Sequence, residues 1–153
     1  LYNLRGMLYK ASRNYKKAEV FVKKAMELSR ALKKEADFAV NQANLGGIYL
    51  QEGSTIGIDL ERIQEAAKFL ESSMPTLTIF GLWHAWATAA SNLGRCFTLL
   101  GQPPKATPYF QQALRIFENQ NDKRNLDIVN RFQKDAEALL RKGAYAKLRV
   151  VGD

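Results

Sequence analysis

The sequence has very few residues of the kinds that hold metals or form covalent cross-links. Among 153 residues there is one cysteine, Cys96, and one histidine, His84. A lone cysteine cannot form an internal disulfide, and these two side chains cannot complete the ligand set of a zinc site. We therefore expect no metal site and no cofactor. A free thiol suits a reducing compartment, so the expected location is the cytoplasm.

Breakers and long apolar runs are also scarce. Only four prolines and ten glycines interrupt the chain, which leaves room for long helices. The longest apolar stretch, residues 79–90, is too short to span a bilayer, and the first residues lack a signal-peptide pattern. No membrane association is expected. Because the chain begins at Leu1 rather than methionine, we expect it to be joined to other domains in a longer protein.

No residue pattern indicates an active site. The sequence has no glycine-rich loop between a strand and a helix that could hold a phosphate, and no nucleophile with a histidine at a predictable distance. Glu61, Glu65 and Glu71 are typical of a solvated helix surface. We expect His84 to be a half-buried helix residue and Cys96 to fill apolar space. The sequence therefore predicts a protein without enzymatic activity and without catalytic residues.

Charge is unevenly distributed along the chain. The first 34 residues contain ten lysines and arginines and two glutamates, a net charge of +8, while the remaining residues are neutral overall. Such an asymmetry can mark an acidic partner or nucleic acid. The alternative is a solvated helix face, because Glu19 and Lys23 are spaced to form an ion pair one helical turn apart.

One short pattern occurs three times. Gly6, Gly46 and Gly94 are spaced by 40 and 48 residues, and an aromatic residue follows each of them three positions later. A small–large–small trio comes next in each unit: Ala18, Val22 and Ala25; Ala66, Leu70 and Ser73; Ala106, Phe110 and Ala113. In the second unit the trio is displaced by about eight residues. A period near 40 residues predicts a stacked array of helical hairpins, in which each glycine lets two helices approach closely.

These residues resemble the tetratricopeptide repeat. Leu93-Gly94-x-x-Phe97, followed by Ala106-x-x-x-Phe110-x-x-Ala113, carries the resemblance, and Leu45-Gly46-x-x-Tyr49 matches its first half. The period near 40 is similar to the longer-helix variety in kinesin light chains and bacterial signalling proteins. Two positions depart from the pattern: Arg5 stands in place of leucine, and Ala90 in place of tryptophan.

The resemblance implies an all-α fold, a right-handed superhelical array of three hairpins plus a C-terminal capping helix. We expect one domain over residues 1–153, with repeat 1 at about 2–34, repeat 2 at about 36–74, repeat 3 at about 82–120 and the capping helix at about 125–142. The tail after Lys142 gives mixed signals. Repeat 2 contains an insertion at 54–58, whose Ile56 and Ile58 either form a contact site or fold back onto the second helix of that repeat.

In the family, the first helices of successive repeats line a groove that receives a peptide. The predicted groove residues are Met7 and Lys10 in repeat 1, Asn44, Gly47 and Gln51 in repeat 2, and Thr88, Ser91, Asn92 and Arg95 in repeat 3. Asn44 and Asn92 occupy equivalent positions, and a carboxamide can both donate to and accept from a peptide backbone. Alternatively, the two asparagines tie neighbouring repeats together. Lys10 and Arg95 favour an acidic ligand.

The sequence therefore predicts a protein- or peptide-binding module, the sensor or scaffold part of a larger signalling or regulatory protein. The alternative function is binding of nucleic acid or of an acidic partner through the basic first hairpin. Nucleic acid is the less favoured partner, because no recognised motif and no aromatic stacking platform on a sheet accompany the positive charge.

Overall fold

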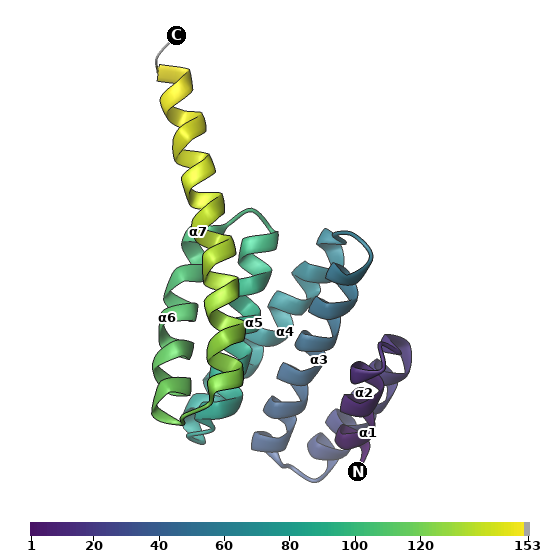
Figure 1. Ribbon diagram of the computed structural model, residues 1–153. Helices are drawn as coiled ribbons and strands as arrows, with labels where there is room; N and C mark the ends of the chain where they lie inside the picture. Colours follow the sequence, from purple (N-terminus) through teal and green to yellow (C-terminus); the bar gives the residue numbers. More distant parts are fainter. Residues whose placement is uncertain (152–153) are drawn as a thin grey trace.

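The computed structural model describes the backbone of residues 1–151 and the side chains of residues 1–143, and within those residues the chain is helical with no strand. The helices are α1 (Tyr2–Ala11), α2 (Tyr15–Ala31), α3 (Glu35–Thr55), α4 (Leu60–Ile79), α5 (Trp83–Leu99), α6 (Pro103–Asn119) and α7 (Lys123–Val151). Figure 1 shows the successive helix pairs following one another across the molecule, with α7 in front of α5 and α6. The predicted all-α array is confirmed.

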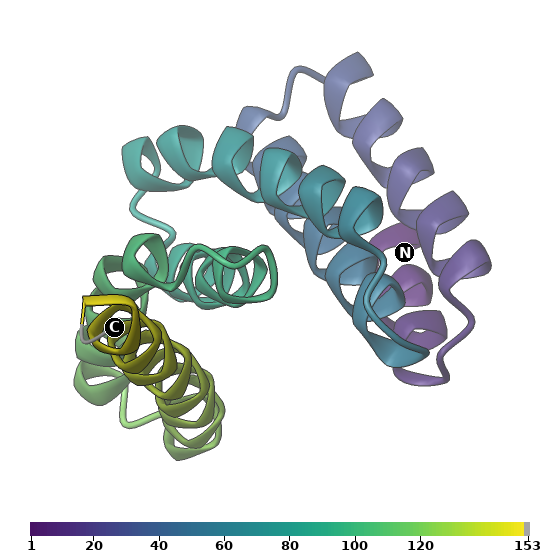
Figure 2. The ribbon, with the colours of Figure 1, turned by 90° about the horizontal axis from the view of Figure 1, so that it is seen from above.

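The helices pack as three hairpins and a covering helix. α1 packs against α2, α3 against α4, and α5 against α6, while α7 lies against α6 and α5. Contacts between α2 and α3 and between α4 and α5 join successive hairpins, and the first helices α1, α3 and α5 also contact each other in that order. Seen from above in Figure 2, the hairpins follow a curved path, with the N-terminus and α7 at opposite ends.

The repeated glycines lie where the two helices of a hairpin cross. A Cβ atom added to Gly94 would lie 2.5 Å from Cε1 of Phe110, and one added to Gly46 would lie 2.7 Å from Cγ of Leu70. Because no side chain can fit into such a space, only glycine permits this separation of the helices. The small and large residues that follow each glycine are buried as the repeat pattern predicts: Ala18, Val22, Ala25, Ala66, Leu70, Ser73, Ala106, Phe110 and Ala113.

Several helix boundaries differ from those suggested by the sequence. α3 continues to Thr55, so only residues 56–58 remain irregular before Asp59, whose side chain caps α4 by accepting from the backbone N–H of Arg62. α4 continues to Ile79, past the predicted end at residue 74, and includes Pro75. At the other end of the chain, α7 reaches Val151, past the predicted end at residue 142.

The core consists of two clusters of buried side chains. The first joins the first two hairpins and extends to Leu93 and Cys96 of α5. The second lies between α5, α6 and α7 and includes Phe110, Phe117 and Val129. Each hairpin therefore shares its apolar surface with the next element along the chain. Among the described residues, no helix is long and apolar enough to cross a membrane.

Candidate functional site

The first helices of the three hairpins enclose a small cavity of about 250 Å³. Six of the predicted groove residues line this cavity: Met7 and Lys10 of α1, Asn44 and Gly47 of α3, and Thr88 and Asn92 of α5. Val40, Ala43, His84, Ala85 and Ala89 complete its lining. The cavity therefore combines residues from all three hairpins, which lie far apart in the sequence.

Two hydrogen-bond donors converge above Gly47. The position that a Cβ atom would occupy on this glycine lies 3.2 Å from Nζ of Lys10 and 3.3 Å from Nδ2 of Asn92. Lys10 comes from the first hairpin and Asn92 from the third, so the missing side chain of Gly47 lets their polar ends approach the same point. Two donors at one point are complementary to an oxygen ligand, and a carboxylate provides two such oxygens.

The environment of Lys10 is unfavourable for its own charge. Burial lowers the pKa of the Lys10 ammonium below its ordinary value. Within residues 1–143 no carboxylate forms an ion pair with this side chain. An ammonium group that has lost water without gaining an anion is destabilised, so an anionic ligand would be attracted to this position.

The two equivalent asparagines have different surroundings. Nδ2 of Asn44 donates to Oδ1 of Asn3 at 3.0 Å, which links α3 to α1. The carboxamide of Asn92 has no hydrogen-bond partner among residues 1–143. Both side chains line the cavity. Asn44 therefore already connects two repeats, while the polar group of Asn92 is free to contact a ligand.

Three predicted groove residues lie outside the lining of this cavity. Nη1 of Arg95 pairs with Oδ2 of Asp135 on α7 at 2.8 Å, and its guanidinium lies 5.2 Å from the ring centroid of Phe132. Ser91 is buried, and its hydroxyl donates to the carbonyl oxygen of Thr88. Gln51 is exposed. The covering helix α7 thus provides the acidic partner of Arg95.

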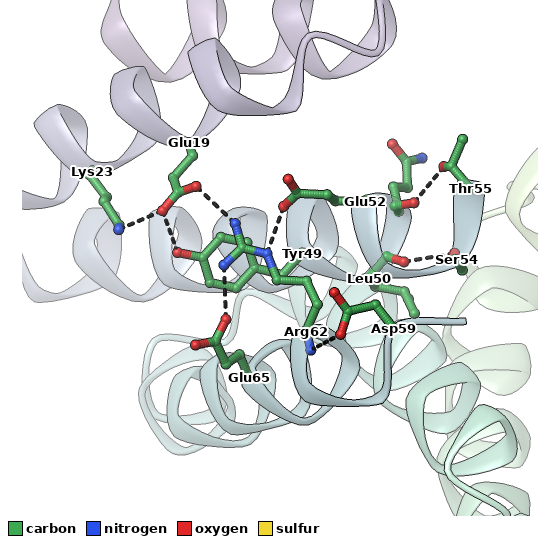
Figure 3. Close-up of polar contacts among 11 residues, drawn as sticks. Glu19, Lys23, Tyr49, Leu50, Glu52, Ser54, Thr55, Asp59, Arg62 and Glu65 are labelled. Atoms are coloured by element: carbon green, nitrogen blue, oxygen red, sulfur yellow. Dashed lines mark hydrogen bonds and ion pairs between the residues drawn. The ribbon is translucent and has the colours of Figure 1, made fainter. Parts of the chain in front are cut away.

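A second polar cluster, which the sequence analysis missed, lies between the first and second hairpins. Figure 3 shows Arg62 of α4 at its centre, with carboxylates on three sides. Its guanidinium contacts Glu52 at 2.6 Å, Glu65 at 2.8 Å and Glu19 at 2.9 Å. The same group lies 3.7 Å from the ring centroid of Tyr49, whose hydroxyl donates to Glu19 at 2.7 Å.

The charges in this cluster stabilise one another. Burial opposes ionisation of Glu19, but hydrogen bonds from Lys23 and Tyr49 and the nearby positive charges outweigh it, so the pKa of Glu19 is lowered. Burial likewise opposes the charge of Arg62. The neighbouring carboxylates outweigh this effect of burial, so the pKa of Arg62 is raised. Because its acceptors and donors satisfy each other, the cluster fixes the two hairpins relative to one another.

Only part of this cluster could have been found from the sequence. Arg62 and Glu65 are three residues apart on one helix, a spacing that predicts contact. Glu19 lies on α2 and Glu52 near the end of α3, and only the folding of the hairpins brings them to Arg62. The interpretation of Glu65 as solvated surface is therefore incomplete: half of its side chain is exposed, yet it forms an ion pair.

The described residues offer little for metal binding or covalent catalysis. No group of three or more histidine, cysteine or acidic side chains within them could hold a metal ion. Cys96 is buried as expected, and burial raises the pKa of its thiol to about 12, so it is not a thiolate nucleophile at neutral pH. His84 is exposed rather than half-buried, and its Nε2 lies 3.1 Å from Oδ2 of Asp122.

The hairpins, their glycine crossings and the cavity across their first helices define an array of helical repeats. Two segments of the chain match models of the tetratricopeptide repeat, residues 1–32 and residues 86–119. The chain therefore contains tetratricopeptide repeats in its first and third hairpins, and repeats of this kind mediate contacts between proteins. A search of curated proteins found no match to the chain.

Proposed function

We propose that the cavity across α1, α3 and α5 binds a peptide segment of a partner protein through a carboxylate group. The observation that carries the proposal is the convergence of Lys10 and Asn92 above Gly47, where two donors meet without an acceptor from the described part of the chain. A carboxylate at this point would accept from both donors and neutralise the ammonium of Lys10.

The size of the cavity favours a peptide over a free small molecule. Its volume of about 250 Å³ is below the range of about 300–1,000 Å³ typical of small-molecule sites. One acidic side chain fits such a space, while the rest of a peptide can follow the neighbouring helix faces. Thr88 and Met7 lie beside the donors and offer one polar and one apolar contact for the adjoining residues of the ligand.

The wider role belongs to the same proposal. We infer a cytoplasmic sensor or scaffold part of a larger signalling or regulatory protein. The support is the glycine spacing of 40 and 48 residues, which resembles the longer-helix repeats of kinesin light chains and bacterial signalling proteins. In this proposal residues 1–153 act as one domain, and the outer ends of the groove extend toward Gln51, Ser91 and Arg95.

A pair of peptide libraries tests the choice of ligand. Each library presents random residues around a fixed central position, which is glutamate in one and glutamine in the other, and bound peptide is measured on the immobilised protein. We expect the glutamate library to bind more strongly. Lys10→Met should abolish this preference and weaken the best glutamate peptide about tenfold, since a charge-assisted hydrogen bond is lost. Lys16→Met is the matched control, because Lys16 is an exposed lysine on α2, outside the cavity.

Equal binding of the two libraries, or a Lys10→Met variant that keeps the preference, would contradict a carboxylate site in this cavity. The two asparagines give a second test. Asn92→Ala should reduce the free energy of peptide binding by about 1 kcal/mol with little change in melting temperature, because the carboxamide of Asn92 has no partner within the described protein. Asn44→Ala should lower the melting temperature instead, since it breaks the hydrogen bond to Asn3. The opposite pattern would show that Asn92 is the structural residue.

A further inference from the structure

The convergence of Lys10 and Asn92 above Gly47 also has the geometry of a site that reacts with carbonyl groups. The point that a Cβ atom of Gly47 would occupy lies 3.2 Å from Nζ of Lys10 and 3.3 Å from Nδ2 of Asn92. A carbonyl carbon at this point would lie within the separation of about 3–3.5 Å from which a nucleophile attacks. Its oxygen, directed toward Asn92, would be within hydrogen-bond distance of Nδ2.

The surroundings of Lys10 favour its nucleophilic form. Only the uncharged amine has the lone pair that attacks a carbonyl carbon, and an ordinary lysine is almost entirely ammonium at neutral pH. Burial lowers the pKa of Lys10, and no acidic side chain of the described chain lines the cavity to restore the charge. A larger fraction of Lys10 is therefore in the reactive form than of a lysine in solvent.

Two other lysines of the first hairpin provide a comparison. Nζ of Lys23 on α2 contacts Oε1 of Glu19 at 2.6 Å, and this hydrogen bond raises the pKa of Lys23. Lys16, on the same helix, is exposed and lies outside the cavity. One hairpin therefore contains a lysine whose charge is opposed by burial, a lysine whose charge is held by a carboxylate, and a lysine in solvent.

The size of the cavity limits what can react with Lys10. This residue is half-buried, so its amine can be reached from solvent, and the cavity volume is about 250 Å³. A short acyl chain fits this space, and Val40, Ala43 and Ala89 in the lining provide apolar contacts for its carbon atoms. The matching reagent is a short acyl group that carries a good leaving group, as in acyl phosphates and thioesters.

We propose that Lys10 is an acylation site for short activated acyl compounds, with Asn92 as the hydrogen-bond donor to the reacting carbonyl oxygen. The nitrogen lone pair of Lys10 attacks the carbonyl carbon, and the bond from that carbon to the phosphate or thiolate breaks. The leaving group departs with the bonding electron pair, and the nitrogen loses one proton to solvent. The product is an uncharged amide at Nζ. Asn92 stabilises the negative charge that develops on the oxygen during the attack.

Acylation would change the groove as well as the lysine. The amide has no positive charge, and its acyl group occupies the point above Gly47. Under the proposed function the same point receives the carboxylate of a peptide, so acylation and peptide binding exclude each other. This regulatory consequence rests on the proposed function, while the reaction at Lys10 rests on the cavity and its residues alone.

Competitive labelling of the whole 153-residue chain tests the reaction. The protein is treated near neutral pH with limiting acetyl phosphate or, in parallel, with a small neutral acetyl thioester, and mass spectrometry follows the acetylated fraction of each lysine. We expect Lys10 to react at least about threefold faster than Lys16, and Lys23 to react most slowly. If exposure alone governed the reaction, Lys10 would be slower than Lys16. The reagent with the larger preference for Lys10 identifies the source of the acyl group.

Two variants test the role of Asn92. Asn92→Ala should slow acetylation of Lys10 at least about threefold, even though it removes a side chain beside the amine, because the carbonyl oxygen loses its donor. Asn92→Asp should slow the reaction further, since a carboxylate beside Lys10 stabilises the unreactive ammonium. Labelling of Lys16 in the same samples is the internal control, because this residue lies outside the cavity. Melting temperatures verify that both variants are folded.

Labelling of Lys10 no faster than that of Lys16 by either reagent would overturn the proposal. Faster labelling of Lys10 in Asn92→Ala would overturn it as well, because access would then control the rate. The best glutamate peptide from the libraries should protect Lys10 from acetylation. Fast labelling without such protection would support the acylation site and contradict the proposed function. Peptide binding that requires Lys10, together with slow labelling, would contradict the acylation site alone.

Discussion

Apolar packing runs through both junctions between successive hairpins, and the junctions differ in the polar contacts that accompany it. Between the first and second hairpins, Arg62 and Glu19 form an ion pair, Tyr49 donates to Glu19, and Asn44 donates to Asn3. Between the second and third hairpins the contact is apolar, with Leu77 of α4 buried in the same cluster as Leu93 and Cys96 of α5. The first is named the polar junction below and the second the apolar junction.

One repeat geometry can therefore add ion pairs and hydrogen bonds to its shared apolar packing. Apolar burial is not directional and depends weakly on pH and salt, so the apolar junction should respond mainly to changes of volume. Ion pairs and hydrogen bonds require a particular geometry and particular ionisation states. The polar junction should therefore be sensitive to acid and salt, and it fixes the angle at which the first hairpin meets the second.

The largest effect is expected at the apolar junction. Leu77→Ala removes a fully buried side chain and should lower the free energy of unfolding by about 3 kcal/mol, because the surrounding helices cannot fill the cavity completely. Chemical denaturation monitored by circular dichroism measures this change. Ile79→Ala, two residues further along α4 and 80% exposed, should change it by less than about 0.5 kcal/mol. Similar losses for the two variants would contradict the assignment of Leu77 to the core.

A smaller loss is expected at the polar junction. Arg62→Met should lower the free energy of unfolding by about 2 kcal/mol, because three carboxylates lose their common partner in a half-buried site. Raising the salt concentration should reduce the difference between the variant and the original protein. Lys68→Met, which removes an exposed charge from the same helix, provides the control. A salt-independent loss would mean that packing of Arg62 on Tyr49 dominates.

Acid should affect the polar junction selectively. The pKa of Glu19 is lowered in the folded protein, so its contribution to stability is complete above the unfolded value of about 4.3 and is lost as pH falls through the folded value. We expect the urea concentration at the unfolding midpoint to decrease as the pH is lowered below about 4. The fall should be shallower in Arg62→Met, which has already lost the pairing. Parallel curves for the two proteins would assign the acid sensitivity to other carboxyl groups.

The smallest effect on stability concerns Gly47, which faces the cavity between both junctions. Gly47→Ala places a methyl group near the side-chain ends of Lys10 and Asn92 and away from any backbone atom, and alanine favours a helix, so the free energy of unfolding should change by less than about 0.5 kcal/mol. Peptide binding should nevertheless be lost, because the methyl group fills the ligand position. Gly46→Ala is the matched contrast: its methyl group would meet Leu70 and the backbone of Ala66, and the melting temperature should drop.

How far the sequence predicted the groove differs from one residue to the next. Helical spacing placed Lys10, Asn44, Thr88 and Asn92 on equivalent faces, and these residues do line one cavity. The same spacing placed Arg95 with them, yet Asp135 of α7 holds it. A periodicity describes one helix at a time, so it identifies the face of a residue and not the neighbour that its side chain will meet.

The hairpins themselves could be predicted from the sequence, because the repeat residues contact one another within a single hairpin. These residues are each glycine, the aromatic residue three positions later, and the small residues of the following helix. Gly94 meets Phe110 in the crossing that the repeat predicts. Only the tertiary structure decided which polar groups would be satisfied. It brings Glu19, Glu52 and Arg62 together from three helices, pairs Asn44 with Asn3, and leaves Lys10 beside Asn92. The physical reason is that an ion pair or hydrogen bond requires its two atoms within about 3 Å, and distances of that size between separate helices are set by how the hairpins stack.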